Sequence, residues 1–124
     1  MRFCWIPDLC RRKFGDDTFG ENAMNTVKVG SIEIANDKPF ALLAGPCAME
    51  TRDHAMFMAE NLKQICDEVG IPLIYKSSFD KANRTSLNAG RGIGLSEAMK
   101  VFQEIKDTFG LPCVTDVHEP HQCA

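Results

Sequence analysis

The chain has 124 residues, of which 44% are hydrophobic and 25% are charged. This composition is typical of one small globular domain and excludes a disordered tail or a fibrous repeat. The 14 basic and 17 acidic side chains give a formal charge of −3, and no cluster of Lys and Arg forms a stripe that could bind several nucleic-acid phosphates. We therefore expect no nucleic-acid partner. No apolar run approaches the roughly 20 residues that a membrane span needs.

The N-terminal residues show no sustained helical or strand period, so we expect residues 1–26 to form an extension outside the fold. The short apolar run near the start ends at Pro7 and Asp8, before the hydrophobic region of a secretory signal could form. Six cysteines are scattered without a C-x-x-C spacing. We expect a cytoplasmic protein with free thiols, in which Cys66 and Cys113 pack in the interior.

Hydrophobic periodicity after this extension predicts a hairpin, a strand and a helix. Alternation over residues 27–34 is typical of a short β-hairpin, and the apolar run at residues 40–44 predicts a buried strand. Apolar residues spaced by three and four over residues 52–69 predict an amphipathic helix, with Thr51 as N-cap and Gly70 as C-terminal stop. The apolar stripe of this helix comprises Ala55, Met58, Ala59, Leu62, Ile65, Cys66 and Val69.

The same order of signals returns further along the chain. Residues 73–75 predict a second buried strand, residues 95–109 carry a second helical stripe that ends at Gly110, and residues 113–117 predict a third strand. Strands that alternate with helices in this way indicate a parallel α/β fold. Two architectures fit: a very small flavodoxin-like sheet, or the opening segment of a βα barrel, which takes about 250 residues when complete.

Polar or reactive side chains follow each predicted strand, at the end where α/β folds gather their functional residues. They are Cys47 after the first strand, Lys76, Ser78, Lys81, Asn83, Arg84 and Thr85 after the second, and Asp116 and His118 after the third. The cations and hydroxyls of the second group suit the phosphate and carboxylate groups of a small anionic substrate. The alternative is a solvated loop whose charges only confer solubility.

Single residues in these segments leave alternatives open. Cys47 could be a nucleophile, a metal ligand or an inert thiol. His118 could form hydrogen bonds in a site or move protons, whereas His54 and His121 suit the surface. The segment Gly90–Gly94 resembles a phosphate-binding glycine loop without its spacing, and it more simply forms a flexible lead into the second helix.

Two segments carry a family resemblance. Residues 75–86 (YKSSFDKANRTS) and 115–120 (TDVHEP) resemble 3-deoxy-D-manno-octulosonate 8-phosphate synthases, and the similarity runs from about Val27 to Ala124. The Lys-Ala-Asn-Arg and Asp-Val-His-Glu sequences favour this family over the sister synthase that uses erythrose 4-phosphate. The resemblance implies an α/β fold in which residues 27–124 form the N-terminal part of a (β/α)8 TIM barrel, preceded by a short β-hairpin. It also implies a homotetramer.

The activity implied by the resemblance is the condensation of phosphoenolpyruvate with D-arabinose 5-phosphate and water. C3 of the enol phosphate joins the sugar aldehyde, water attacks C2, and the resulting hemiketal phosphate loses inorganic phosphate. The product is an eight-carbon sugar acid phosphate used for lipopolysaccharide. The rival from another class is a non-enzymatic α/β module that binds a phosphorylated metabolite at the same strand ends.

Roles are implied residue by residue. Lys76, Ser78 and Lys81 resemble phosphoenolpyruvate contacts, Asn83, Arg84 and Thr85 resemble the segment that holds arabinose 5-phosphate, and Asp116 and His118 resemble catalytic residues near the aldehyde. Cys47 matches a position at which metal-dependent members have Cys, which implies a divalent metal ion. The other metal ligands of the family lie in the second half of the barrel, so we expect the 124-residue chain alone to be inactive.

Overall fold

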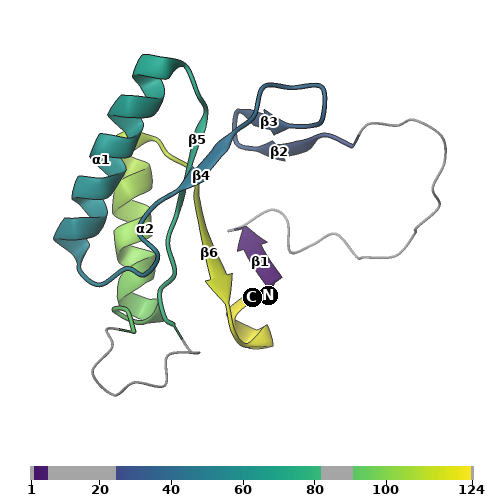
Figure 1. Cartoon of the computed structure of the whole chain (residues 1–124). Helices are drawn as coiled ribbons and strands as arrows, with labels where there is room; N and C mark the ends of the chain where they lie inside the picture. Colours follow the sequence, from purple (N-terminus) through teal and green to yellow (C-terminus); the bar gives the residue numbers. More distant parts are fainter. Residues whose placement is uncertain (1, 6–24, 82–90, 124) are drawn as a thin grey trace.

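A computed structural model describes residues 2–5, 25–81 and 91–123 of the chain. Two helices cover one face of a four-stranded sheet, and a hairpin lies against the other face (Figure 1). The elements in chain order are β1 (Arg2–Trp5), β2 (Val27–Val29), β3 (Ile32–Ile34), β4 (Leu42–Ala44), α1 (Arg52–Val69), β5 (Leu73–Lys76), α2 (Leu95–Phe109), β6 (Cys113–Val117) and the 3₁₀ helix η1 (Pro120–Cys123).

The larger sheet has the order β1-β6-β5-β4. Strands β4, β5 and β6 are parallel, which confirms the predicted α/β class, whereas β1 pairs with β6 in the antiparallel direction. Within the described residues the sheet ends at β1 and β4 and does not close on itself. The division of the chain at residue 26 stays a prediction, although four residues of that segment, Arg2–Trp5, lie in the sheet.

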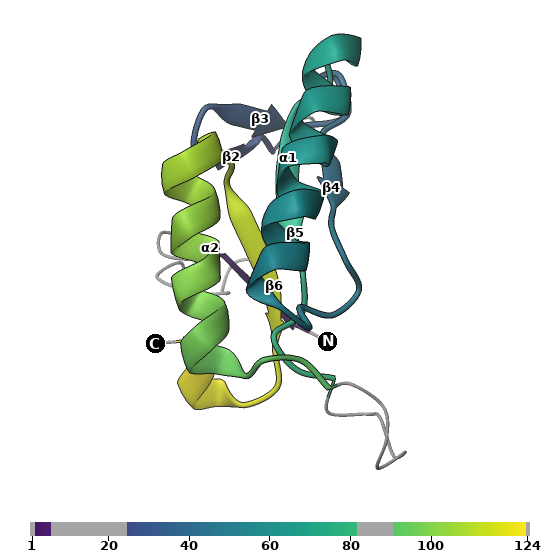
Figure 2. The same cartoon turned by 90° about the vertical axis from the view of Figure 1, so that its left-hand side faces the viewer.

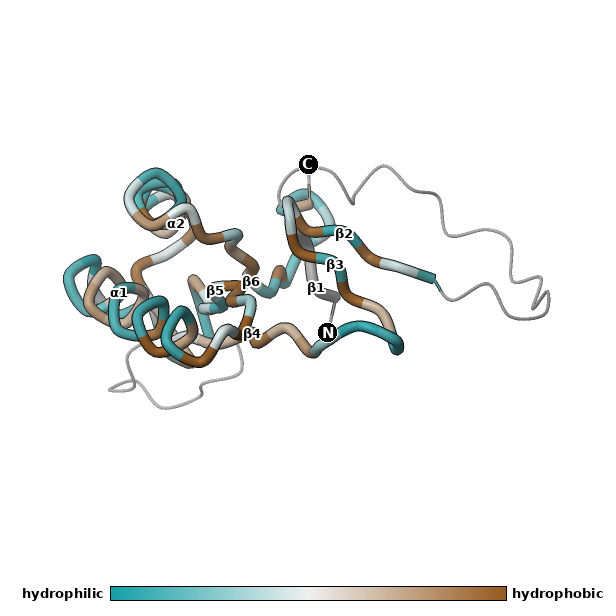
Figure 3. The backbone as a smooth tube through the Cα atoms, turned by 90° about the horizontal axis from the view of Figure 1, so that it is seen from above, coloured by the Kyte–Doolittle hydropathy of each residue, from teal (hydrophilic) through white to brown (hydrophobic). Residues whose placement is uncertain are grey.

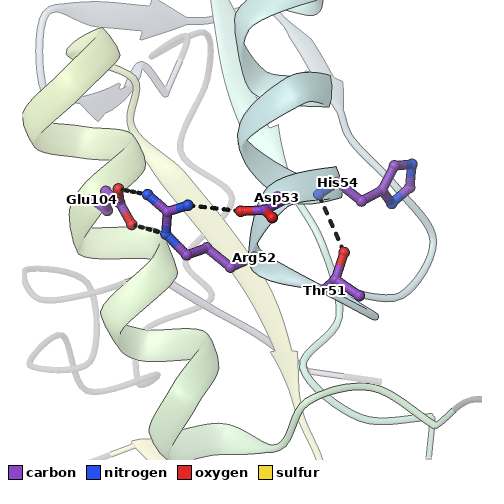
Figure 4. Close-up of polar contacts among 5 residues, drawn as sticks. All are labelled: Thr51, Arg52, Asp53, His54 and Glu104. Carbon is purple, nitrogen blue, oxygen red and sulfur yellow. Dashed lines mark hydrogen bonds and ion pairs between the residues drawn. The ribbon is translucent and has the colours of Figure 1, made fainter.

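Both helices have the predicted bounds because local signals fix their ends. The Thr51 hydroxyl accepts a hydrogen bond from the His54 amide at 3.2 Å and so caps α1 (Figure 4). Gly70 and Gly110 end α1 and α2 in the left-handed conformation, with φ of 70° and 69°, which glycine adopts without steric cost. No helix of the described residues is long and apolar enough to cross a membrane.

The helices pack on the sheet through apolar side chains, and Figure 3 shows both helices on the same side of β5 and β6. Ala55 of α1 and Ile105 of α2 are fully buried, and the ring of Tyr75 on β5 meets Phe102 edge to face at 6.3 Å between centroids. Figure 2 shows α1 and α2 side by side, and Arg52 of α1 donates from Nε to Glu104 of α2 at 2.8 Å (Figure 4). This ion pair is exposed, so packing rather than charge holds the helices together.

One face of α1 differs from the sequence-based expectation. Ile65 and Val69, which belong to the predicted apolar stripe, are 56% and 60% exposed. The predicted buried strand at residues 40–44 is also shorter and more open, because Phe40 lies outside β4 and Leu43 within β4 is 45% exposed. The reason is position: β4 is an end strand, and within the described residues α1 has a helical neighbour only on its α2 side.

The predicted hairpin over residues 27–34 is confirmed as β2 and β3. Its buried Val29 packs against Ile74 of β5 and Val114 of β6, on the face of the sheet opposite the helices. Side chains alternate along a strand, so Lys76 lies on the same face as Ile74, and Asp116 on the same face as Val114. The strands therefore direct a lysine and an aspartate to one face at their carboxyl ends.

Candidate functional site

Two lysines, a serine and an aspartate meet at the carboxyl ends of β5 and β6; we call them the strand-end cluster. The Ser78 hydroxyl accepts hydrogen bonds from the Nζ atoms of Lys76 at 3.2 Å and Lys81 at 2.6 Å. The same Lys76 Nζ lies 3.9 Å from Oδ1 of Asp116. The structure thus brings four of the residues singled out in the sequence into one group.

Backbone contacts hold the cluster in place. Ala48 forms a parallel bridge with Ser78, and the Met49 amide donates to the Ser78 carbonyl at 2.8 Å. Gly45 lies so close to β5 that a Cβ atom there would be 2.0 Å from the Lys76 carbonyl oxygen. A residue without a side chain is required at this position, because any Cβ would push the two strand ends apart.

The Asp116 carboxylate is nearly buried but remains ionised at neutral pH. Burial raises the pKa of this carboxyl, but the Ser78 hydroxyl, the backbone and the ammonium groups of Lys76 and Lys81 outweigh burial and hold the pKa below its ordinary value. Within the described residues, Oδ1 of Asp116 is buried without a hydrogen-bond partner. The cluster therefore offers two cations and one carboxylate oxygen able to accept a further hydrogen bond.

His118 lies beside the cluster in a fixed orientation. Its Nε2 donates to the Asp80 carbonyl at 3.0 Å, and its ring packs against Phe79 with centroids 5.4 Å apart. Its backbone amide donates to Oε1 of Gln122 at 2.8 Å, which ties η1 to the end of β6. When the ring is neutral and Nε2 carries the proton, Nδ1 is the atom that can accept one.

Cys47 is exposed and directly precedes the bridge between Ala48 and Ser78, at the same end of the sheet as the cluster. The chemistry of a thiolate suits a metal such as zinc, but one ligand does not make a metal site. In the part of the chain that the structure describes, no three His, Cys, Asp or Glu residues lie close enough to hold a metal ion.

Asn83, Arg84 and Thr85 lie outside the described residues, so the role predicted for them stays a prediction. Three predictions of exposure or burial agree with the structure: His54 and His121 are exposed, and Cys66 is buried.

Cys113 is in part buried, and burial raises the pKa of its thiol to about 12. A thiol with so high a pKa is almost fully protonated near neutral pH and reacts slowly. This agrees with the packing role predicted for it.

Sequence reasoning missed an ion pair beside the cluster. Arg91 donates to both carboxylate oxygens of Asp80, from Nε at 3.0 Å and from Nη2 at 2.8 Å. The hydrogen bonds from Arg91 are the largest cause that holds the pKa of Asp80 below its ordinary value. The glycine-rich segment is the available signal, but its composition predicts only a flexible lead into the helix. In the structure Arg91 and Gly92 contact residues 79–81.

Comparison with known proteins places the chain in a family. The sequence profile of the DAHP synthetase I family matches residues 19–124. The chain belongs to the DAHP synthetase I family. Over 102 residues it is 59% identical to proteins of Brucella anthropi, Brucella suis and Brucella melitensis that are each named 2-dehydro-3-deoxyphosphooctonate aldolase.

These alignments cover 82% of this DAHP synthetase I family member but only 37% of each relative. The chain therefore spans little more than a third of the length of the relatives it matches. The relatives carry another name for 3-deoxy-D-manno-octulosonate 8-phosphate synthase, so the family resemblance drawn from residues 75–86 and 115–120 is confirmed.

Proposed function

We propose that this sequence forms the N-terminal part of a (β/α)8 barrel that condenses phosphoenolpyruvate with D-arabinose 5-phosphate and water. The observation that carries the proposal is the strand-end cluster, found in a chain 59% identical to 2-dehydro-3-deoxyphosphooctonate aldolases. The parallel order of β4, β5 and β6, with both helices on one face, supports the barrel.

Phosphoenolpyruvate carries a phosphate and a carboxylate on a small carbon frame, and the cluster offers a cation for each. Lys76 and Lys81 both reach the Ser78 hydroxyl, so their ammonium groups lie within a few ångströms of one oxygen atom. The Lys76 side chain is partly exposed and accessible to a ligand. An anion bound here would replace the lysine contacts to Ser78 with stronger charge-assisted hydrogen bonds.

The reaction makes a bond between C3 of the enol phosphate and the sugar aldehyde carbon, while water adds to C2. The hemiketal phosphate then breaks its C–O bond and releases inorganic phosphate. Lys76 and Lys81 would stabilise the charge on the phosphate and carboxylate during these steps. Asp116 is ionised and therefore accepts hydrogen bonds, and together with His118 it is our candidate for the groups beside the aldehyde. Asn83, Arg84 and Thr85 are our candidates for holding arabinose 5-phosphate.

Cys47 is our candidate for one thiolate ligand of a divalent metal ion, which would polarise the aldehyde or water when bound. The described residues supply no complete ligand set, so no step of the reaction is derived through a metal. We further propose that the complete barrel works in the cytoplasm as a homotetramer, as the family resemblance implies.

The proposal is tested first on binding. Phosphoenolpyruvate should shift the amide NMR signals of Ser78 and Lys81 in the 124-residue chain, and Lys76→Met or Lys81→Met should weaken binding at least about tenfold, since each removes a charge-assisted contact. Lys100→Met is the matched control, because Lys100 is an exposed lysine on α2 that pairs with Glu97. Equal affinity in all three variants would contradict the assignment.

Turnover is tested separately. With both substrates we expect no phosphate release from the 124-residue chain, and release with arabinose 5-phosphate rather than erythrose 4-phosphate from a longer polypeptide that contains this sequence. Steady release by the 124 residues alone would refute the inactivity of this part. Binding without turnover in every form would favour a non-enzymatic module instead.

A further inference from the structure

Residues 80 and 81 are joined to Arg91 twice, once through side chains and once through the backbone. The Arg91 guanidinium binds both oxygens of the Asp80 carboxylate. The Lys81 amide donates to the Arg91 carbonyl at 2.7 Å. Arg91 therefore contacts both the residue that carries a site cation, Lys81, and the carboxylate that precedes it.

Further contacts fix Arg91 in this position. The Gly94 amide donates to the Phe79 carbonyl at 3.1 Å, and the Ile93 amide donates to the Met49 carbonyl at 2.9 Å. A Cβ atom on Gly92 would lie 2.2 Å from the Phe79 carbonyl oxygen. The segment after Arg91 is thus held against the chain that follows β5, and the guanidinium reaches Asp80 from a fixed backbone.

Asp80 would otherwise interfere with the strand-end cluster. Its carboxylate belongs to the residue directly before Lys81, and neighbouring residues of opposite charge can pair, as Arg52 and Asp53 do at 2.7 Å in this chain. A Lys81 paired with Asp80 would no longer be directed at Ser78. An unpaired negative charge beside the cluster would also repel an anionic ligand.

We propose that Arg91 is a positioning residue that holds the Asp80 carboxylate away from Lys81 and so keeps the Lys81 ammonium available to an anionic substrate. This inference rests on the proposed function for the identity of the ligand. The link between Arg91, Asp80 and Lys81 can be tested without any ligand.

The first experiment follows the Asp80 carboxyl carbon by NMR as the 124-residue chain is titrated with acid. The groups that act on Asp80 are Arg91, the Lys81 amide and the His118 ring, and together they hold its pKa below the ordinary value. In Arg91→Ala we expect Lys81 to take the place of Arg91, so the pKa of Asp80 stays low. Adding Lys81→Met to that variant should raise the pKa of Asp80 toward its ordinary value, because neither side-chain cation is then left beside the carboxylate.

A return to the ordinary value in Arg91→Ala alone would overturn the proposal, because it would show that Lys81 does not pair with a released Asp80. The same titration in Arg91→Lys is the matched control. The lysine is also positively charged and can pair with Asp80, so the pKa of Asp80 should stay low. Amide NMR spectra of each variant show whether residues 73–81 keep their fold. If they do not in Arg91→Ala, Arg91→Met takes its place, because it keeps a long side chain without the charge.

The second experiment measures phosphoenolpyruvate affinity. Arg91→Ala should weaken binding at least about tenfold, and Asp80→Asn combined with Arg91→Ala should restore most of it, since the interfering charge is then gone. If Arg91 only supported the backbone, removing the Asp80 charge would not restore the affinity. A double variant that binds as weakly as Arg91→Ala therefore counts against the proposal. If the unchanged chain does not bind phosphoenolpyruvate, the proposed function fails, while the Asp80 titration still decides the inference.

Discussion

The ammonium of Lys76 and the carboxylate of Asp116 lie 3.9 Å apart at the ends of two neighbouring parallel strands, and the Asp116 side chain is only 3% exposed. A buried carboxylate is stable as an anion only where cations and hydrogen-bond donors offset the loss of solvation. Lys76, Lys81 and Ser78 supply them here. The strand-end cluster is therefore one electrostatic unit, and a change to one member acts on the others.

Asp116→Asn should destabilise the chain by about 1 to 3 kcal/mol at pH 7, because it removes the charge that Lys76 and Lys81 stabilise. The folded-state pKa of Asp116 lies below its unfolded value of about 3.9, so this contribution is present above that pH and is lost as the pH falls through the folded pKa. Urea unfolding at pH 7 and pH 3 measures the free energy of unfolding of the unchanged chain and of Asp116→Asn. The difference between the two values should be smaller at pH 3 than at pH 7.

The matched control for this prediction is Asp107→Asn. Asp107 is an exposed aspartate on α2 that accepts a hydrogen bond from Gln103 at 2.8 Å. Its replacement should change stability by less than about 0.5 kcal/mol at either pH. Equal effects of the two substitutions at pH 7 would contradict a special role of the Asp116 charge.

Thiol labelling separates two cysteines by their surroundings. Cys47 is exposed, whereas burial raises the pKa of Cys113 to about 12 and so leaves little thiolate at pH 8. Iodoacetamide should therefore alkylate Cys47 at least about 100-fold faster than Cys113 in the folded chain. Peptide mapping by mass spectrometry gives both rates. In concentrated urea, which unfolds the chain, the two rates should become similar because Cys113 is no longer buried. Fast labelling of Cys113 without urea would show that α2 does not stay packed on β6.

Gly45→Ala should be strongly destabilising, by about 3 kcal/mol or more, because its Cβ would meet the Lys76 carbonyl at 2.0 Å and backbone cannot move aside cheaply. Gly30→Ala is the control, since nothing lies within 4 Å of a Cβ there and only its φ of +58° is unfavourable, at about 1 kcal/mol. Thermal unfolding of both variants gives the comparison. A smaller loss for Gly45→Ala than for Gly30→Ala would place β4 further from β5.

Most of the features that could be predicted from the sequence depend on contacts between residues that are close in the chain. Thr51, Gly70 and Gly110 fix the helix ends through contacts within a few residues, so a pattern of residue types reveals them. The strand-end cluster was also predictable, because the carboxyl ends of parallel strands always meet at one edge. Asp80 and Arg91 are eleven positions apart and no helical or strand period relates them, so only the folded chain shows their ion pair.

The side of α1 that faces the core could not be predicted from its apolar stripe alone. Ile65 and Cys66 are neighbours in sequence and both fit the stripe, yet Cys66 is 2% exposed and Ile65 is 56% exposed. The apolar stripe of α1 is wider than the surface that contacts the sheet, so some of its side chains stay exposed. The position of the neighbouring helix α2 determines which of these side chains are covered. The same hydrophobic residue type can therefore contribute very differently to stability in this chain.

Replacing two isoleucines measures that difference. Ile105→Ala on α2 removes a fully buried side chain and should cost about 2 to 5 kcal/mol, because it leaves a cavity among Tyr75, Phe102 and their neighbours. Ile65→Ala on the exposed face of α1 should cost less than about 1 kcal/mol. Urea unfolding of both variants at one protein concentration gives the two values. A loss of several kcal/mol for Ile65→Ala would mean that another surface covers this face of α1 in solution.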